Sequence, residues 1–118
     1  MVTLSYARLR MLSPELRNVV GRYRSRLSSE LRSKLVRVVV FGSAARGQAH
    51  EDSDVDVLVL LDAPDRLERR RALDLAGEIA LETGVPLAPV VQSLDQWNEL
   101  LARERRFPLE VERDGVEA

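Results

Sequence analysis

Two short apolar runs, residues 35–41 and 55–61, constrain the fold of this chain more than any other feature. Both runs are rich in β-branched residues and have the length of a β-strand. The segment between them opens with a Gly-Ser pair at 42–43 and closes with an Asp-x-Asp pattern at 54–56. The polar groups therefore come where one strand ends and the next begins, and loops there can present them to a ligand.

The Gly-Ser pair has the composition of a phosphate-binding turn. Gly42 has no Cβ, so the backbone can turn tightly and approach a ligand closely. Ser43 adds a hydroxyl donor beside it. A short helix over residues 43–46, ended by Gly47, would direct unpaired backbone N–H groups at an anion. The alternative is an ordinary strand-turn-helix connection with no ligand.

The Asp-x-Asp pattern predicts a metal site. Asp54 and Asp56 are two residues apart, and such residues point to the same face of a strand. Two carboxylates this close repel each other unless a cation lies between them. Mg²⁺ or Mn²⁺ prefers oxygen ligands and can also hold the phosphates of a nucleotide. The alternative, two solvated acids at a strand start, suits Asp56 less well because its neighbours are apolar.

Two further polar residues lie between these motifs. The guanidinium of Arg46 could reach a triphosphate, or it could pair with Glu51 or Asp52 and shape the loop. His50, the one histidine of the chain, could contact a phosphate or an acceptor, or it could be an exposed loop residue.

Together, GSAARG at 42–47 and SDVD at 53–56 resemble the signature of the nucleotidyltransferase superfamily related to DNA polymerase β. The closest resemblance is to its minimal nucleotidyltransferase branch, whose members are small, stand-alone and prokaryotic. The resemblance implies a nucleotidyltransferase fold with a mixed sheet. It also implies that Gly42 and Ser43 hold the β- and γ-phosphates of a nucleoside triphosphate, and that Asp54 and Asp56 ligate Mg²⁺ or Mn²⁺.

The same resemblance implies an activity and a partner. Enzymes of this family transfer a nucleoside monophosphate, here AMP from ATP, to an acceptor hydroxyl and release pyrophosphate. Minimal members are commonly paired with a small helical protein of the HEPN class, often an RNase toxin, and some act as antitoxins by adding AMP to it. We therefore expect a toxin–antitoxin pair, with the site completed by that partner or by a second copy of the chain.

One departure from the family pattern concerns a third carboxylate, which the family carries on a later strand. The matching strand, residues 86–92, contains no acid, and Ala88 or a neighbour stands in its place. Without that group the acceptor oxygen is less well positioned and its proton has no obvious base. The alternative function is therefore a weak or inactive nucleotide-binding module that neutralises its partner by contact.

Composition narrows the remaining classes. The 118 residues are 45% hydrophobic and contain no cysteine, which predicts one domain over 1–118 without disulfides or thiolate metal sites. A charged fraction of 31% and the lack of a long apolar run indicate a soluble, cytoplasmic protein without membrane segments. Only 4% of the residues are aromatic, which argues against a base-stacking surface for nucleic acid.

Charge is distributed unevenly along the chain. Residues 1–37 contain nine basic and two acidic side chains, whereas residues 38–118 contain nine basic and 17 acidic ones. The basic segment could meet an acidic partner, RNA or the phosphates of the nucleotide, or it could simply solvate an exposed helix. Binding of RNA would show a steep salt dependence.

The other elements follow from caps and periodicity. Ser13-Pro14 predicts the start of an amphipathic helix, and a second long helix is expected from Asp62-Ala63-Pro64 to Gly84. The strand at 86–92 contains two prolines and should lie at a sheet edge. Ser93 and Gln96 predict a capping box and a helix that ends near Arg106, broken by Phe107-Pro108, with Trp97 in packing rather than in nucleotide stacking. The chain is thus expected to be α/β, with a small sheet flanked by α-helices.

Overall fold

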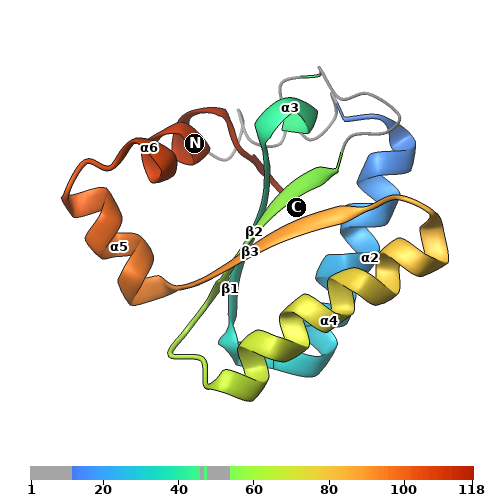
Figure 1. Cartoon of the computed structure of the whole chain (residues 1–118), viewed down its shortest axis with the longest axis horizontal. Coiled ribbons are helices and arrows are strands. Elements are labelled where there is room, and N and C mark those ends of the chain that lie inside the picture. The colour runs from blue at the N-terminus through green and yellow to red at the C-terminus, as the bar shows by residue number, and fades with distance from the viewer. Residues whose placement is uncertain (1–11, 46, 48–53) are drawn as a thin grey trace.

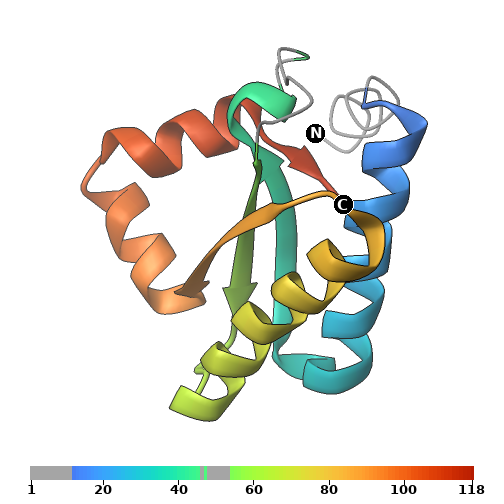
Figure 2. The ribbon, with the colours of Figure 1, turned by 45° about the vertical axis from the view of Figure 1, so that its right-hand side comes forward.

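The computed structural model describes residues 12–45, 47 and 54–118, and shows a four-stranded mixed sheet with helices on both faces (Figures 1 and 2). The strands are β1 (Leu35–Phe41), β2 (Val55–Leu61), β3 (Leu87–Ser93) and β4 (Val116–Glu117). The helices are α2 (Pro14–Leu31), α3 (Gly42–Ala45), α4 (Arg66–Thr83), α5 (Leu94–Ala102) and α6 (Arg106–Asp114), with a 3₁₀ turn at Arg32–Lys34. The predicted α/β class with a small mixed sheet is confirmed.

The sheet has the strand order β3-β2-β1-β4. β1 is antiparallel to β2 and to β4, whereas β2 and β3 are parallel. The N–H of Val55 donates to the Pro86 carbonyl over 2.9 Å, so the backbone polar groups of Pro86 face β2. Successive residues of a strand direct these groups to alternate sides, so the backbone of Pro89, three residues later, faces the outer edge of β3. The N–H that Pro89 lacks would have no partner in the sheet there, and no ladder bond is lost. The predicted edge position of this strand is confirmed.

The two faces of the sheet carry separate cores because side chains alternate along each strand. On β2, Val57 and Val59 join the buried cluster under α2 and α4. Leu58 and Leu60 point the other way and join the cluster with Trp97 under α5 and α6. Trp97 is 1% exposed, so its predicted role in packing is confirmed.

Helix α2 begins where its cap predicts. The Ser13 hydroxyl accepts a hydrogen bond from the Leu16 N–H (3.1 Å), and Pro14 is the first helical residue. Tyr23 lies at the centre of the buried stripe and donates from its hydroxyl to the Ala72 carbonyl of α4 (2.8 Å). Burial raises the pKa of Tyr23, so this hydroxyl stays a donor that ties the two long helices together.

The predicted start of α4 is too early. Asp65, not the Asp62-Ala63-Pro64 segment, caps this helix through a capping box in which Asp65 and Glu68 accept each other's backbone N–H (2.8 and 2.9 Å). Ala63 has φ 42°, a left-handed conformation that no helix contains. The predicted end is confirmed, since Gly84 has φ 74° at the helix C-cap.

The predicted course of the chain after Ser93 is partly wrong. The capping box of Ser93 and Gln96 is present, but α5 ends at Ala102 rather than near Arg106, and Glu104 follows with φ 54°. Phe107-Pro108 does not stop a helix; it lies in the first turn of α6. Proline is tolerated there because N–H groups of the first turn have no partner within the helix.

Part of the uneven charge is neutralised within the molecule. Arg26 of α2 pairs with Glu82 of α4 (Nη2 to Oε1, 2.6 Å). Arg37 of β1 donates to Glu112 of α6 (2.5 Å) and to Glu117 of β4 (Nε to Oε1, 2.8 Å). Several basic side chains of the first segment therefore bind acids of the second. Among the described residues, no helix is both long and apolar enough to cross a membrane.

Candidate functional site

Gly42 and Asp56 meet at the end of the β1–β2 pair. Gly42 follows β1 directly with φ 72°, a conformation that L side chains rarely adopt. A Cβ built on Gly42 would overlap Oδ2 of Asp56 and stand 3.3 Å from its Cγ. The backbone of the Gly-Ser turn therefore lies directly against a carboxylate of the Asp-x-Asp pattern, and only glycine allows this approach. The two motifs that the sequence separates are brought together.

The two carboxylates occupy different environments. Asp54 lies immediately before β2 and is exposed, whereas Asp56 lies within β2 and is partly buried. Asp56 alternates with Leu58 and Leu60, which face α5 and α6, so its side chain lies on that face of the sheet. Asp54 lies two residues earlier, just before β2, where the same alternation would put it on that face. The placement of the two carboxylates side by side stays a prediction from this spacing.

The sheet register places this site between two neighbours. Phe41 of β1 and Ala88 of β3 are the Cα partners of Asp56 on its two sides. Ala88 is thus the residue of β3 beside Asp56, and every residue of β3 is uncharged. Among the described residues, no group of three acids, histidines or cysteines could hold a metal ion.

Ser43 is the second residue of α3 and is partly buried beside Gly42. The predicted short helix over 43–46 is present as α3, which begins one residue earlier, at Gly42. Gly47 has φ 70°, and its N–H donates to the Ala44 carbonyl (3.2 Å). Arg46, His50, Glu51 and Asp52 lie outside the described residues, so the predictions for them stay predictions.

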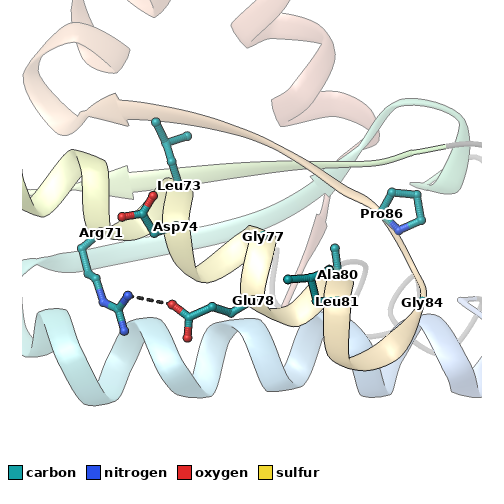
Figure 3. A pocket seen from close by; sticks show the side chains of 9 residues that line it. All are labelled: Arg71, Leu73, Asp74, Gly77, Glu78, Ala80, Leu81, Gly84 and Pro86. Atoms are coloured by element: carbon teal, nitrogen blue, oxygen red, sulfur yellow. Dashed lines mark hydrogen bonds and ion pairs between the residues drawn. The ribbon is translucent and has the colours of Figure 1, made fainter.

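Cavity size alone does not lead to this site. A hollow of about 870 Å³ lies on the outer side of α4 (Figure 3). It is lined by Arg71, Leu73, Asp74, Gly77, Glu78, Ala80, Leu81, Gly84 and Pro86. Arg71 pairs there with Glu78 (2.7 Å), and Leu81 is 88% exposed. None of these residues belongs to the Gly-Ser turn or the Asp-x-Asp pattern.

The contribution of α6 to this site was not predicted from the sequence. A smaller pocket of about 210 Å³ has Gly42 in its lining, together with Glu110 and Asp114 of that helix. The signal in the sequence was hidden, because Phe107-Pro108 suggested a helix break where a helix begins. Two acids were therefore not expected near the Gly-Ser turn.

Comparison with known proteins decides the family. The model of the nucleotidyltransferase domain matches residues 22–109, which include both motifs, the strands β1 to β3 and the helices α3 to α5. This chain belongs to the nucleotidyltransferase domain family. The assignment agrees with the resemblance carried by the Gly-Ser turn and the Asp-x-Asp pattern.

Two relatives of this nucleotidyltransferase come from Methanocaldococcus jannaschii. This chain is 33% identical over 78 residues to "Putative protein adenylyltransferase MJ0141", and the aligned region covers 65% of this chain and 79% of the relative. It is 32% identical over 73 residues to "Putative protein adenylyltransferase MJ0604", and that aligned region covers 62% of this chain and 69% of the relative.

Solved structures share the fold. A structure described as "a putative nucleotidyltransferase from Sulfolobus solfataricus" matches with a TM-score of 0.55 and 17% identity, over 95% of this chain and 82% of that one. A toxin–antitoxin structure with AMP-PNP matches with a TM-score of 0.52 and 24% identity, over 80% of this chain and 68% of that one. At these identities the likeness establishes the nucleotidyltransferase fold.

The donor set is compatible with the divalent ion that the family implies. Asp54 and Asp56 offer hard oxygen ligands on one face of a strand, and the Asp56 carboxylate lies against the Gly42 backbone. Mg²⁺ is commonly bound by one or two carboxylates and completes its shell with waters and substrate phosphates. The two carboxylates next to the Gly-Ser turn fit that requirement.

Proposed function

We propose that this chain is a nucleotidyltransferase that uses a divalent metal ion, and that it transfers AMP from ATP to a hydroxyl group of a HEPN-type partner protein. The observation that carries the proposal is the close approach of the Gly42 backbone to the Asp56 carboxylate. This approach supports a single site in which the Gly-Ser turn binds phosphate and the Asp56 carboxylate binds the metal ion. Two relatives named as protein adenylyltransferases support AMP as the transferred group and protein as the acceptor.

Each described residue has a role in this proposal. Gly42 and Ser43 bind the β- and γ-phosphates through the backbone N–H groups at the start of α3 and through the Ser43 hydroxyl. Asp54 and Asp56 would hold Mg²⁺ or Mn²⁺ through their carboxylate oxygens. The bound ion supplies positive charge that stabilises the phosphate oxygens. Arg46, by its place in the motif, is proposed to neutralise the triphosphate further.

The reaction joins the acceptor oxygen to the α-phosphorus and breaks the bond between the α- and β-phosphates. Pyrophosphate leaves, and the acceptor proton passes to solvent or to a base of the partner protein. The latter route matters because the position of β3 next to Asp56 is Ala88, which cannot take a proton. The partner is proposed to be the toxin of a toxin–antitoxin pair, because the similar structure with AMP-PNP is that of a toxin–antitoxin system.

A second candidate function is neutralisation of the partner by contact, without transfer. The observation that favours it is the uncharged strand β3 beside Asp56. Ala88→Asp distinguishes the two, because it restores a carboxylate at the register position of the third ligand. An increase in AMP transfer would show a catalyst limited by that missing group. Unchanged absence of transfer, with the partner still neutralised, would favour contact alone.

The main test follows AMP from ATP labelled at the α-phosphate into the partner protein, with and without Mg²⁺. We expect Asp54→Asn/Asp56→Asn to abolish transfer while the fold, followed by circular dichroism, is retained. The matched control is Asp62→Asn/Asp95→Asn, which removes two exposed carboxylates away from the site. Neutralisation of the toxin by the Asp54→Asn/Asp56→Asn variant would contradict transfer as the mechanism of neutralisation.

A further inference from the structure

A pocket beside the Gly-Ser turn has no role in the function proposed so far. It has a volume of about 210 Å³ and lies between the end of β1 and α6. It is lined by Phe41, Gly42, Phe107, Glu110, Val111 and Asp114. Since a water molecule takes about 30 Å³ of liquid, there is room for a group several times that size. Gly42 belongs both to this pocket and to the proposed phosphate site, so one molecule can occupy both.

The walls of the pocket are aromatic and apolar. The rings of Phe41 and Phe107 meet edge to face, with centroids 5.4 Å apart and an interplanar angle of 76°. Val111 is 3% exposed and belongs to the core under α5 and α6. Phe107, in contrast, is 37% exposed, so part of its ring is available to a ligand. Such walls suit a flat, weakly polar ring.

Two carboxylates complete the lining. Glu110 pairs with Arg106 within α6 (2.8 Å), and Asp114, whose side chain is 32% exposed, pairs with Arg113 (3.0 Å). An ionised carboxylate has several lone-pair positions and only accepts hydrogen bonds. The pocket therefore favours a ligand that donates hydrogen bonds, and it disfavours a second phosphate group.

The position of the pocket distinguishes nucleotide from acceptor. Phe41 on β1 and Ala88 on β3 flank Asp56 on opposite sides, and the pocket lies on the β1 side. The leaving pyrophosphate is proposed to lie on that side too, at Gly42 and Ser43. In phosphoryl transfer the attacking oxygen comes roughly in line with the leaving group, so the acceptor approaches from the β3 side. The pocket on the β1 side is left for the nucleotide.

We propose that this pocket binds the base of the nucleoside triphosphate, and that Glu110 and Asp114 select a base that carries an exocyclic amino group. The inference rests on the proposed function, because the phosphates at Gly42 anchor the base nearby. Adenine, cytosine and guanine have such an amino group to donate to a carboxylate, whereas uracil has none. ATP is therefore preferred over UTP.

The chain contains its own reporter for this event. Trp97 is the one tryptophan, and its ring lies 5.9 Å from that of Phe107, edge to face at 88°. Trp97 is buried and does not line the pocket. A base that packs on Phe107 changes the surroundings of this pair, and thus the fluorescence of Trp97, whereas inorganic tripolyphosphate bound at Gly42 leaves the ring contact unchanged.

The experiment titrates the full chain with ATP, UTP and inorganic tripolyphosphate in the presence of Mg²⁺, by calorimetry and by Trp97 fluorescence. We expect ATP to bind about tenfold more tightly than UTP, as one hydrogen bond to a charged group would give. Only nucleotides should change the fluorescence. In Glu110→Gln/Asp114→Asn the preference for ATP disappears, while tripolyphosphate still binds. The matched control is Glu99→Gln, which removes an acid from a similar ion pair with Arg103 on α5.

Three outcomes would overturn the inference. If ATP and UTP bind with equal affinity and tripolyphosphate also binds, the pocket does not select the base, whereas the proposed phosphate site is still supported. Tighter binding of all three ligands by Glu110→Gln/Asp114→Asn would show that the acids act only by repulsion. No binding of any of the three would remove the proposed site and the base pocket together. The comparison of ATP with UTP in the unaltered chain keeps the test valid if the double variant does not fold.

Discussion

The two faces of the sheet differ in the length of the helices that cover them and in the size of the core beneath (Figure 2). On one face the 18-residue helices α2 and α4 lie side by side over a core of 18 buried residues among those described. On the other, the nine-residue helices α5 and α6 cover five. Ion pairs such as Arg26–Glu82 and Arg71–Glu30 join α2 to α4.

The larger core and the candidate site lie on opposite faces of the sheet. Asp56, the pocket at Gly42 and the acids of α6 all lie on the thinly covered face, or at its end. A ligand needs accessible backbone and side chains, which a fully packed helix layer would exclude. The closed face can therefore stabilise the domain while the open face carries the site. The predictions below test this division.

The largest effect is expected from two neighbouring leucines of β2. Leu60 and Leu61 are both 0% exposed but belong to the clusters on opposite faces. We expect Leu61→Ala to lower the free energy of unfolding by about 3–5 kcal/mol and Leu60→Ala by about 2–3 kcal/mol, because the larger core loses more packing around the cavity. Urea denaturation measures both. An equal loss in the two variants would contradict the division between the faces.

A second comparison separates backbone strain from the site itself. Gly42 and Gly84 have nearly the same φ, 72° and 74°, but only a Cβ at Gly42 would meet Asp56. Alanine at either position costs about 1–2 kcal/mol of strain. We expect Gly42→Ala alone to weaken tripolyphosphate binding, by about tenfold or more, as measured by calorimetry. Intact binding in Gly42→Ala would show that the close approach is not needed.

A third prediction concerns the attachment of the thin face. Arg37 is half-buried on β1 and donates to Glu112 of α6 and Glu117 of β4. We expect Arg37→Met to lower the free energy of unfolding by about 1–2 kcal/mol, because both acids lose a charged hydrogen-bond partner. Amide exchange should accelerate first in residues 106–117. Uniform acceleration over α2 and α4 would mean that Arg37 supports the whole fold instead.

The smallest effect is a pH dependence of the closed face. Hydrogen bonds from Arg71 lower the pKa of Glu30, and those from Arg26 lower the pKa of Glu82. A lowered pKa in the folded state adds stability above the ordinary carboxyl pKa, and this stability is lost as the pH falls through the folded value. In Arg26→Gln/Arg71→Gln we expect a shallower loss of stability below about pH 5, followed by urea midpoints. An unchanged slope would assign the loss to other acids.

Sequence reasoning was reliable where local chemistry decides the structure. The cap at Ser13, the box at Ser93 and the end at Gly84 depend on side chains within a few residues, and all three are present. Strand periodicity also predicts that Asp56 lies on the face of Leu58 and Leu60, and the structure has Asp56 within β2. The role of Asp54 and Asp56 in metal binding stays a prediction.

The failures occurred where the local sequence gives no clear signal or where a distant contact decides. Glu104 adopts a left-handed φ of 54°. Glycine and asparagine are the residues that usually indicate such a helix end, and neither is present there, so the predicted helix continued too far. Pro108 was interpreted as a break, although the first turn of a helix accepts proline. The strand β4 contains two residues and exists through pairing with β1. Because α6 was not predicted, neither was the pocket that it forms.

The two parts of the site are also expected to form at different times during folding. Gly42 directly follows β1 and Asp56 lies on the adjacent antiparallel strand β2, fourteen residues further along the chain, so closing the chain between them costs little entropy. Val40 and Val116 are 76 residues apart, and their pairing brings α6 to β1. Local antiparallel pairs form within microseconds, whereas distant contacts slow folding. During folding, the contact between Gly42 and Asp56 should therefore be assembled before the pocket that α6 forms.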